Sequence, residues 1–102
     1  MLVHATEAVE LLGEADRKDL ESDRIMQLAL TRLMEIVGEA ASRVSEATRQ
    51  RHPQIPWRRI IGTRNRLAHG YDVVDLDILW DIVRNDLPPL IGQLGEIVGE
   101  GA

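Results

Sequence analysis

The sequence contains no cysteine and no phenylalanine. The lack of cysteine excludes several kinds of functional site. Without cysteine there is no disulfide framework, no thiolate zinc site and no thiol nucleophile. This composition fits a reducing compartment, so we expect the protein to be cytoplasmic. No segment approaches the roughly 18 apolar residues that a transmembrane helix requires, and the N-terminus lacks the basic and apolar regions of a signal peptide. We therefore predict no membrane association and no secretion by an ordinary signal.

Several well-known enzyme signatures are also missing. There is no HExxH motif, no glycine-rich phosphate loop and no GxSxG, so metalloprotease, nucleotide-hydrolase and serine-hydrolase functions have no support. The acidic segment DVVDLDILWD resembles a set of metal ligands, but it lacks the glycine and the distal glutamate of a calcium loop. Acidic residues are favoured at a helix start by the macrodipole. We interpret Asp72, Asp75 and Asp77 as structural and predict neither a metal nor a cofactor.

Proline is scarce, and none occurs before Pro53, which favours helices in the first half of the chain. Apolar residues at helical spacing predict a first helix that ends near Gly13, followed by the polar connection EADRKDLESD. Ser22 or Asp23 can cap a long second helix, because a short oxygen-bearing side chain accepts hydrogen bonds from the free amides of the first turn. The segment RQRHPQIP ends that helix, since the residue before each proline avoids helical geometry.

The long second helix has an unusually wide apolar stripe and a glycine at its middle. The stripe predicts a central helix that other helices contact on more than one side. Gly38 costs about 1 kcal/mol relative to alanine in a helix, so we expect another helix to approach closely there.

In the second half of the chain, a third helix is predicted from Trp57 to about Ala68. Asp75 can cap the next helix, and Asp86 can cap a restart whose first turn accommodates the two prolines of LPP. No strand alternation or repeat appears. We predict one all-α domain over residues 1–102, an up-and-down bundle of four or five helices with an aliphatic core. The wide stripes favour a homodimer.

Charge is distributed unevenly along a chain whose net charge is −5. No acid occurs from position 47 to position 71, a segment with two of the three histidines and half of the basic residues. Such a segment can attract phosphate locally, or it can be a solvated cationic face. Its arginines are Arg49, Arg51, Arg58, Arg59, Arg64 and Arg66.

The stretch RNRLAHGYD, residues 64–72, concentrates groups that can do chemistry. His69 follows Arg64 by five positions near a helix end, so both side chains could face one cleft. Histidine exchanges protons near neutral pH, and arginine binds phosphate bidentately. Together they suffice for metal-independent RNA cleavage with the 2′-hydroxyl as nucleophile. The alternative is that Arg64, Arg66 and His69 only complement the negative end of their helix.

Two glutamates of the long helix, Glu35 and Glu39, share a face because they are four residues apart. They could serve carboxylate chemistry, or they could simply be exposed to solvent. A third alternative is that Glu39 reaches an arginine of the third helix and forms a buried ion pair that supports the site.

The motif RNRLAHGY resembles the Arg-x4-His-x-Tyr pattern of HepT-like proteins, a branch of the HEPN ribonucleases. The resemblance continues through MEIVGEAASRVSE, HPQIPWRRIIGTRNRLAHGYDVVDLDILW and NDLPPL, and covers roughly residues 25 to 97. It implies an all-helical homodimer whose Arg and His face a shared cleft, and metal-free cleavage of RNA, either tRNA or mRNA, to a 2′,3′-cyclic phosphate. Arg64 is then the phosphate clamp, His69 the general acid or base, and Asn65 a positioning residue.

Further residues are expected to act beside Arg64 and His69. Arg58, Arg59 and Arg66 are expected to contact RNA, and Glu39 to support the site. Relatives are encoded beside a minimal nucleotidyltransferase antitoxin, MntA, which transfers AMP to the motif tyrosine. This implies a type VII-like toxin–antitoxin pair in which AMPylation of Tyr71 silences the ribonuclease, because added phosphates would block the cleft and repel RNA.

Other functions stay open at the level of the sequence. The first helix, which starts at MLVHATEAVELL, is shorter than the family's usual opening helix. A catalytically inactive HEPN module that binds nucleotide or a nucleotidyltransferase partner would use the same cleft. A purely structural helical dimer would not depend on the motif.

Overall fold

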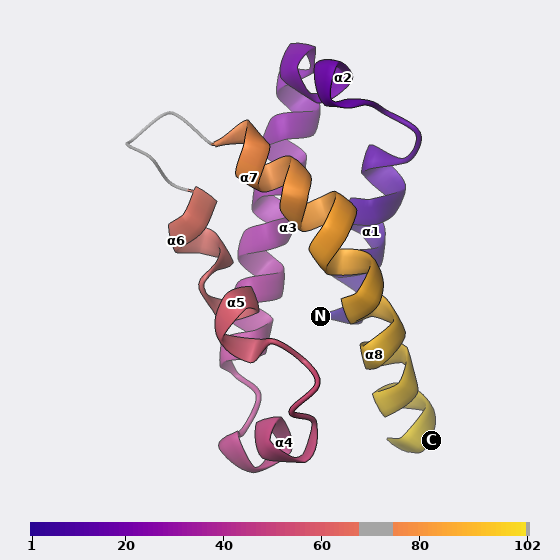
Figure 1. The fold of residues 1–102 in the computed structure, drawn as a ribbon, viewed down its shortest axis with the longest axis vertical. Helices are drawn as coiled ribbons and strands as arrows, with labels where there is room; N and C mark the ends of the chain where they lie inside the picture. The colour runs from indigo at the N-terminus through magenta and orange to yellow at the C-terminus, as the bar shows by residue number, and fades with distance from the viewer. Residues whose placement is uncertain (68–74, 102) are drawn as a thin grey trace.

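The structure, a computed structural model, describes residues 1–67 and 75–101, without the side chains of Arg64 and of residues 98–101. Its regular elements within these ranges are α1 (Leu2–Leu12), α2 (Arg17–Ser22), α3 (Arg24–Ser42), α4 (Glu46–Arg51), α5 (Trp57–Ile61), α6 (Thr63–Leu67), α7 (Leu76–Asp81), the π-helical turn η1 (Ile82–Asp86) and α8 (Leu87–Gly101). The chain runs along α1, returns along α3, reverses again through α5 and α6, and returns through α7, η1 and α8 (Figure 1). The all-α prediction is confirmed.

Helix α3 is the centre of the fold, as the width of its apolar stripe predicts. It packs against α1 on one side and against α5 and α6 on another, and α8 packs against α1. The core is aliphatic, because the buried side chains are mostly leucine, isoleucine, valine and alanine with one methionine. Within the described residues, no helix combines the length and the apolar character needed to cross a membrane. The α3 residues buried in the core are Leu30, Met34, Val37 and Ala41.

The predicted helix boundaries in the first 40 residues are largely correct. Helix α1 ends at Gly13, whose φ of 49° is a conformation that glycine adopts without strain. Asp23 caps α3 by accepting a hydrogen bond from the Met26 amide at 2.9 Å. The short helix α2 was not predicted, because its sequence is polar; a capping box between Asp16 and Asp19 holds it.

Gly38 marks the close approach that the sequence predicts. A Cβ built on Gly38 would lie 3.1 Å from the carbonyl oxygen of Ile60 in α5. The two backbones therefore meet without a side chain between them, which places α5 directly against α3. Helix α6, which follows α5 in the chain, also packs on α3.

Two predicted helices are shorter than expected. The long helix ends at Ser42 and not at the proline segment, because Ser45 starts α4 by accepting the Thr48 amide on its hydroxyl oxygen at 3.2 Å. Arg49 of α4 then donates to the carbonyl oxygens of Ala41 and Ser42, at 3.3 and 2.9 Å, which satisfies the end of α3. The predicted helix from Trp57 to Ala68 is split at Gly62 into α5 and α6.

The predicted helix break before LPP does not occur. The chain stays helical from α7 into α8 through the π-helical turn η1, in which the Leu87 amide donates to the Ile82 carbonyl five residues earlier. A proline ring at position 88 clashes with the carbonyl four residues before it in a regular α-helix, and a wider turn relieves this clash. Asp86 is therefore not a helix cap, and its carboxylate is available to other elements.

Candidate functional site

The motif begins on α6, which carries Arg64 and Asn65. Asn65 is exposed and does not contribute to the core. Arg64 lies within α6, but its side chain, like all of His69 and Tyr71, lies outside the described residues. The structure therefore defines the support of the predicted site and not the arrangement of its reacting groups.

Helix α6 is fixed at both of its ends. Thr63 is buried and its hydroxyl donates to the Arg59 carbonyl oxygen at 3.1 Å. Leu67 is buried at the other end, and its carbonyl oxygen accepts the amide of Asp75 at 3.1 Å. The chain thus leaves α6 and re-enters α7 at one place. His69 and Tyr71 belong to the segment that connects these two joined points.

Asp75 anchors the far side of this connection. Its carboxylate accepts the amides of Asp77 and Ile78 at 3.0 and 3.1 Å, which caps α7 as predicted. Asp77 in turn accepts from Arg17 of α2 at 2.7 Å. Asp81, the third described acid of the segment DVVDLDILWD, accepts a hydrogen bond from Asn85 at 2.6 Å. All three described acids therefore have structural partners, and Asp72 lies outside the described residues.

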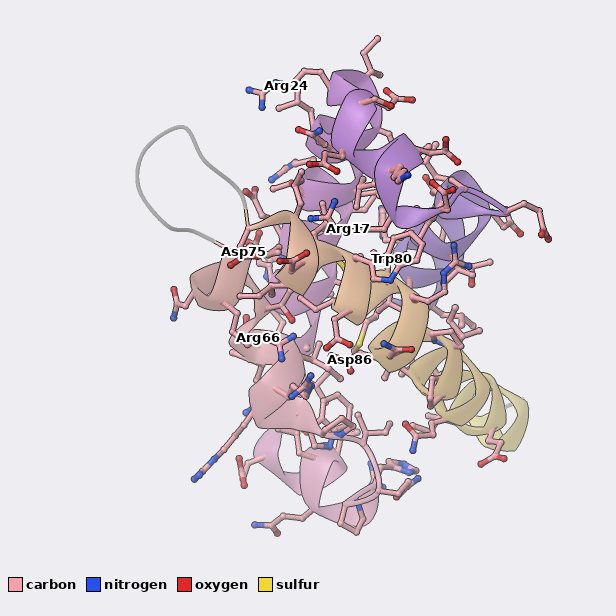
Figure 2. All side chains as sticks on the ribbon, turned by 45° about the horizontal axis from the view of Figure 1, so that its top comes forward. Arg17, Arg24, Arg66, Asp75, Trp80 and Asp86 are labelled. Atoms are coloured by element: carbon pink, nitrogen blue, oxygen red, sulfur yellow. The ribbon has the colours of Figure 1, made fainter. Side chains whose placement is uncertain are left out.

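Asp86 of η1 binds two arginines that belong to the predicted RNA-binding set. One carboxylate oxygen accepts from Nε of Arg59 on α5 at 2.8 Å and from Nη2 of Arg66 on α6 at 3.3 Å. Asp81 adds a longer contact, 3.5 Å, to Arg59. Figure 2 shows Arg66 and Asp86 extending toward one another between α6 and the long C-terminal helical run. This cluster links the motif helix to η1.

The cluster lowers the free positive charge that the sequence suggests for the segment without acids. The hydrogen bond and the charge of Asp86, with a smaller contribution from Asp81, raise the pKa of Arg59 above its ordinary value. The segment without acids in the sequence is thus partly neutralised in space. Sequence reasoning missed this role of Asp86, because its position before two prolines indicates a cap and nothing local indicates its arginine partners.

Arg58 differs from Arg59 and Arg66. Its side chain is exposed, and no hydrogen bond or ion pair joins it to any residue that the structure describes. Of the three arginines that we assign to RNA, Arg58 is therefore the one whose charge is not already engaged by a carboxylate. The assignment of all three stays a prediction.

Glu39 does not form the buried ion pair that was one of its three alternatives. Its Oε1 lies 2.8 Å from Nη2 of Arg43 on the same helix, and its side chain is 60% exposed. Glu35 pairs with Arg32 at 3.2 Å in the same manner. Both glutamates match the solvent-exposed alternative, and a supporting role for Glu39 stays untested.

Histidine, aspartate and glutamate are the side chains of this sequence that could hold a metal ion, because it has no cysteine. Within residues 1–67 and 75–101, no three of these side chains gather closely enough to do so.

Comparisons with known proteins agree on one family. A family model described as Ribonuclease HepT-like matches residues 1–97. A protein named probable ribonuclease HepT, from Thermococcus cleftensis, is 37% identical over 95 residues, which cover 89% of this chain and 86% of the relative. A provisionally named RNase of Methanocaldococcus jannaschii is 31% identical over 90 residues, covering 88% of this chain and 83% of the relative. Another, from Caldanaerobacter subterraneus, is 32% identical over 101 residues, covering 95% and 90%. No solved structure matches the chain.

Proposed function

The chain belongs to the HepT-like ribonuclease family, and from this membership we propose that it is an endoribonuclease toxin that cleaves RNA without a metal ion. The observation that carries the proposal is that the family match spans residues 1–97 and so includes the whole Arg64, His69 and Tyr71 motif. The chain provides no cysteine nucleophile, and this motif contains the groups needed for acid–base chemistry on a phosphodiester.

In the proposed reaction, the 2′-oxygen of one nucleotide attacks the adjacent phosphorus and the bond to the 5′-oxygen breaks. The products are a 2′,3′-cyclic phosphate and a 5′-hydroxyl. His69 transfers a proton, as the base that takes it from the 2′-hydroxyl or as the acid that gives it to the 5′-oxygen. Arg64 binds the phosphate and stabilises the charge that develops on it. Asn65, exposed on the same helix, positions the substrate.

The fixed position of α6 supports this assignment, because catalytic groups must be held in a defined geometry. The Asp86 cluster holds α6 from one side, and the hydrogen bond between Asp75 and Leu67 closes the motif segment. A tRNA or an mRNA can serve as the substrate.

We also propose that two chains form the cleft. Ile25 and Leu28 lie on one face of α3 and are 80% and 53% exposed. Exposed large apolar side chains that are neighbours on a helix surface, three residues apart, favour burial against a partner. The molecule is also thin, 17 Å along its shortest axis, so a second copy adds core that one copy lacks. A homodimer in which both motifs face one cleft accounts for these features.

The proposed partner is a minimal nucleotidyltransferase antitoxin of the MntA type. In the proposed transfer, the phenolic oxygen of Tyr71 attacks the α-phosphorus of ATP, pyrophosphate leaves and the phenolic proton is released. The AMP group would place negative charge beside Arg64 and His69 and exclude RNA. Tyr71 is the only tyrosine of the chain, so mass spectrometry of the intact protein reports this modification directly.

The decisive experiment incubates end-labelled tRNA, in EDTA, with protein whose intact mass shows an unmodified Tyr71. We expect the wild type to cut RNA and to leave cyclic phosphate ends. We expect His69→Ala and Arg64→Ala each to lose roughly a hundredfold or more in rate, because one removes the proton-transferring group and the other the charge stabilisation. Circular dichroism should show that both variants keep the helical fold.

A folded His69→Ala variant that cleaves RNA as fast as the wild type would contradict the proposal. If instead the wild type leaves RNA intact and its expression without the antitoxin gene is harmless, the inactive HEPN module becomes the better explanation. Isothermal titration with a nucleotide would then test that module.

A further inference from the structure

A shallow surface hollow between α4 and α5 combines an aromatic ring with positive charge. Pro53, Pro56 and Trp57 form its apolar part. Arg49 and Arg58 border it, together with Arg59, Gln50 and Glu46. The proposed catalytic motif does not use this hollow, although α5 leads through Gly62 directly into the motif helix α6.

Trp57 has a fixed orientation at the start of α5. Its indole Nε1 donates a hydrogen bond to the carbonyl oxygen of His52 at 3.1 Å, and part of its ring packs against the core. The side chain remains partly exposed where it lines the hollow. An aromatic ring that is already ordered loses little entropy when a planar group stacks on it, and nucleobases are the planar groups that RNA offers.

Among the arginines around the hollow, Arg58 is the one whose positive charge is most available to an anion. Arg58 has no hydrogen-bond or ion-pair partner among the described residues, whereas its neighbour Arg59 is bound by Asp86. Arg49 is held in place by carbonyl oxygens at the C-terminal end of α3, and no carboxylate of the described residues forms an ion pair with it. Glu46 is the one carboxylate of the lining.

We propose that this hollow is a subsite for one nucleotide of a single-stranded RNA, with the base stacked on Trp57 and its phosphate bound by Arg58. The subsite rests on the proposed ribonuclease function and extends it, because a strand bound here continues along α5 toward the cleft on α6. A nucleotide supplies both a planar base and a phosphate. An acidic protein segment supplies the charge but no planar group for the ring, so it uses only half of the hollow.

The test measures binding of a fluorescently labelled single strand with 2′-O-methyl riboses, which lacks the attacking hydroxyl and cannot be cut by the proposed reaction. We expect Trp57→Leu to weaken binding roughly 5- to 150-fold, the range that corresponds to loss of one stacked base. We expect Arg58→Ala to lower the slope of log affinity against log salt by about 0.7, the value for one phosphate contact on a single strand. Trp57→Phe keeps an aromatic face and should retain most of the affinity.

Arg24→Ala is the matched control. Arg24 is also exposed on a helix and has no partner among the described residues, but it lies at the beginning of α3, far from α4 and α5 (Figures 1 and 2). We expect Arg24→Ala to leave both the affinity and the salt slope unchanged. Circular dichroism and thermal unfolding show which variants are folded, and if Trp57→Leu does not fold, Trp57→Phe and Arg58→Ala decide.

Three results would overturn the subsite. The first is unchanged affinity in both Trp57→Leu and Arg58→Ala. The second is an equal loss in Arg24→Ala, which would indicate diffuse charge attraction. The third is a loss in Arg58→Ala alone together with displacement of the strand by polyglutamate, which would indicate a site for acidic protein segments. Because the probe cannot be cleaved, a protein that binds it as expected but cuts no RNA refutes the ribonuclease proposal and leaves the subsite standing.

Discussion

Arg84 and Asp86 belong to the same π-helical turn, yet they hold two different parts of the molecule. Arg84 donates to the carbonyl oxygens of Gly13 and Ala15 at 3.0 and 2.8 Å, and its guanidinium lies 4.8 Å from the centre of the Trp80 ring. Asp86 accepts from Arg59 and Arg66 on α5 and α6. Residues two positions apart do not face the same side of a helix, so one turn contacts two elements.

The two contacts differ in what they fix. The Arg84 side closes the connection between α1 and α2, which carries no residue of the motif. The Asp86 side closes on α6, which carries Arg64 and Asn65. Similar polar contacts from one turn can thus serve different purposes. Both should contribute to stability, but only the Asp86 side should influence cleavage.

The largest expected effect is that of Asp86→Ala. Removing the carboxylate takes the counter-charge from the partly buried Arg66 and leaves the more exposed Arg59 with only its 3.5 Å contact to Asp81. Nε of Arg66 already has no hydrogen-bond partner among the residues that the structure describes. We expect the free energy of unfolding to fall by about 2 kcal/mol, measured by urea denaturation. We also expect kcat on RNA to fall roughly ten- to a hundredfold, because α6 and the motif lose part of their support.

The split between kcat and KM separates positioning from stability. In folded Asp86→Ala protein, Arg66 loses its carboxylate partner and Arg59 keeps only the longer contact with Asp81, so both can bind phosphate more readily and KM should not rise even though kcat falls. Asp86→Asn keeps the size and an acceptor oxygen but loses the charge, and it should be intermediate in both stability and kcat. An unchanged kcat in fully folded Asp86→Ala would show that Asp86, like Arg84, acts on stability alone.

Arg84→Ala tests the other side of the turn. It removes two hydrogen bonds to carbonyl oxygens and the contact with Trp80, so we expect a loss of about 1–2 kcal/mol in the free energy of unfolding. Cleavage per folded molecule should equal that of the wild type at a temperature where both are folded. Arg32→Ala is the control for removing an exposed arginine that pairs with Glu35 three residues later on the same helix. A large loss of kcat in Arg84→Ala would show that both sides of the turn support the motif.

The parts of this fold that could be predicted depend on signals close together in the sequence. Asp23 and Asp75 cap helices because their carboxylates accept amides two or three residues later. Gly13 ends α1 because its positive φ suits glycine. Gly38 is informative for a similar reason, since a glycine inside a helix implies that something lies close to it. Each of these signals involves one residue or one turn.

Helices α2 and α4 were missed although their caps are local, but the missed features that support the motif helix depend on contacts between distant segments. Asp86 is 27 residues from Arg59 and 20 from Arg66, so local spacing cannot reveal their contact. The π-helical turn accommodates two prolines while α7 and α8 remain one continuous helical run. Whether the helix breaks or widens at this point depends on how α7 and α8 pack in the folded chain. For the candidate site, the sequence identifies the motif on α6, but the surroundings of Arg64 are decided by Asp86 and by the closure at Leu67 and Asp75.

The smallest expected effect is that of Glu39→Ala, which changes a charge outside both contacts of the turn. Glu39 is mostly exposed, and its carboxylate pairs with Arg43, the residue directly after α3. Such a pair contributes about 0.3–0.5 kcal/mol, so urea denaturation should show little change and RNA cleavage none. Glu35→Ala removes the equivalent pair with Arg32 and serves as the matched control. If Glu39→Ala lowers kcat while Glu35→Ala does not, Glu39 must act across the dimer cleft, and the predicted supporting role would be correct for a reason that one copy of the chain does not display.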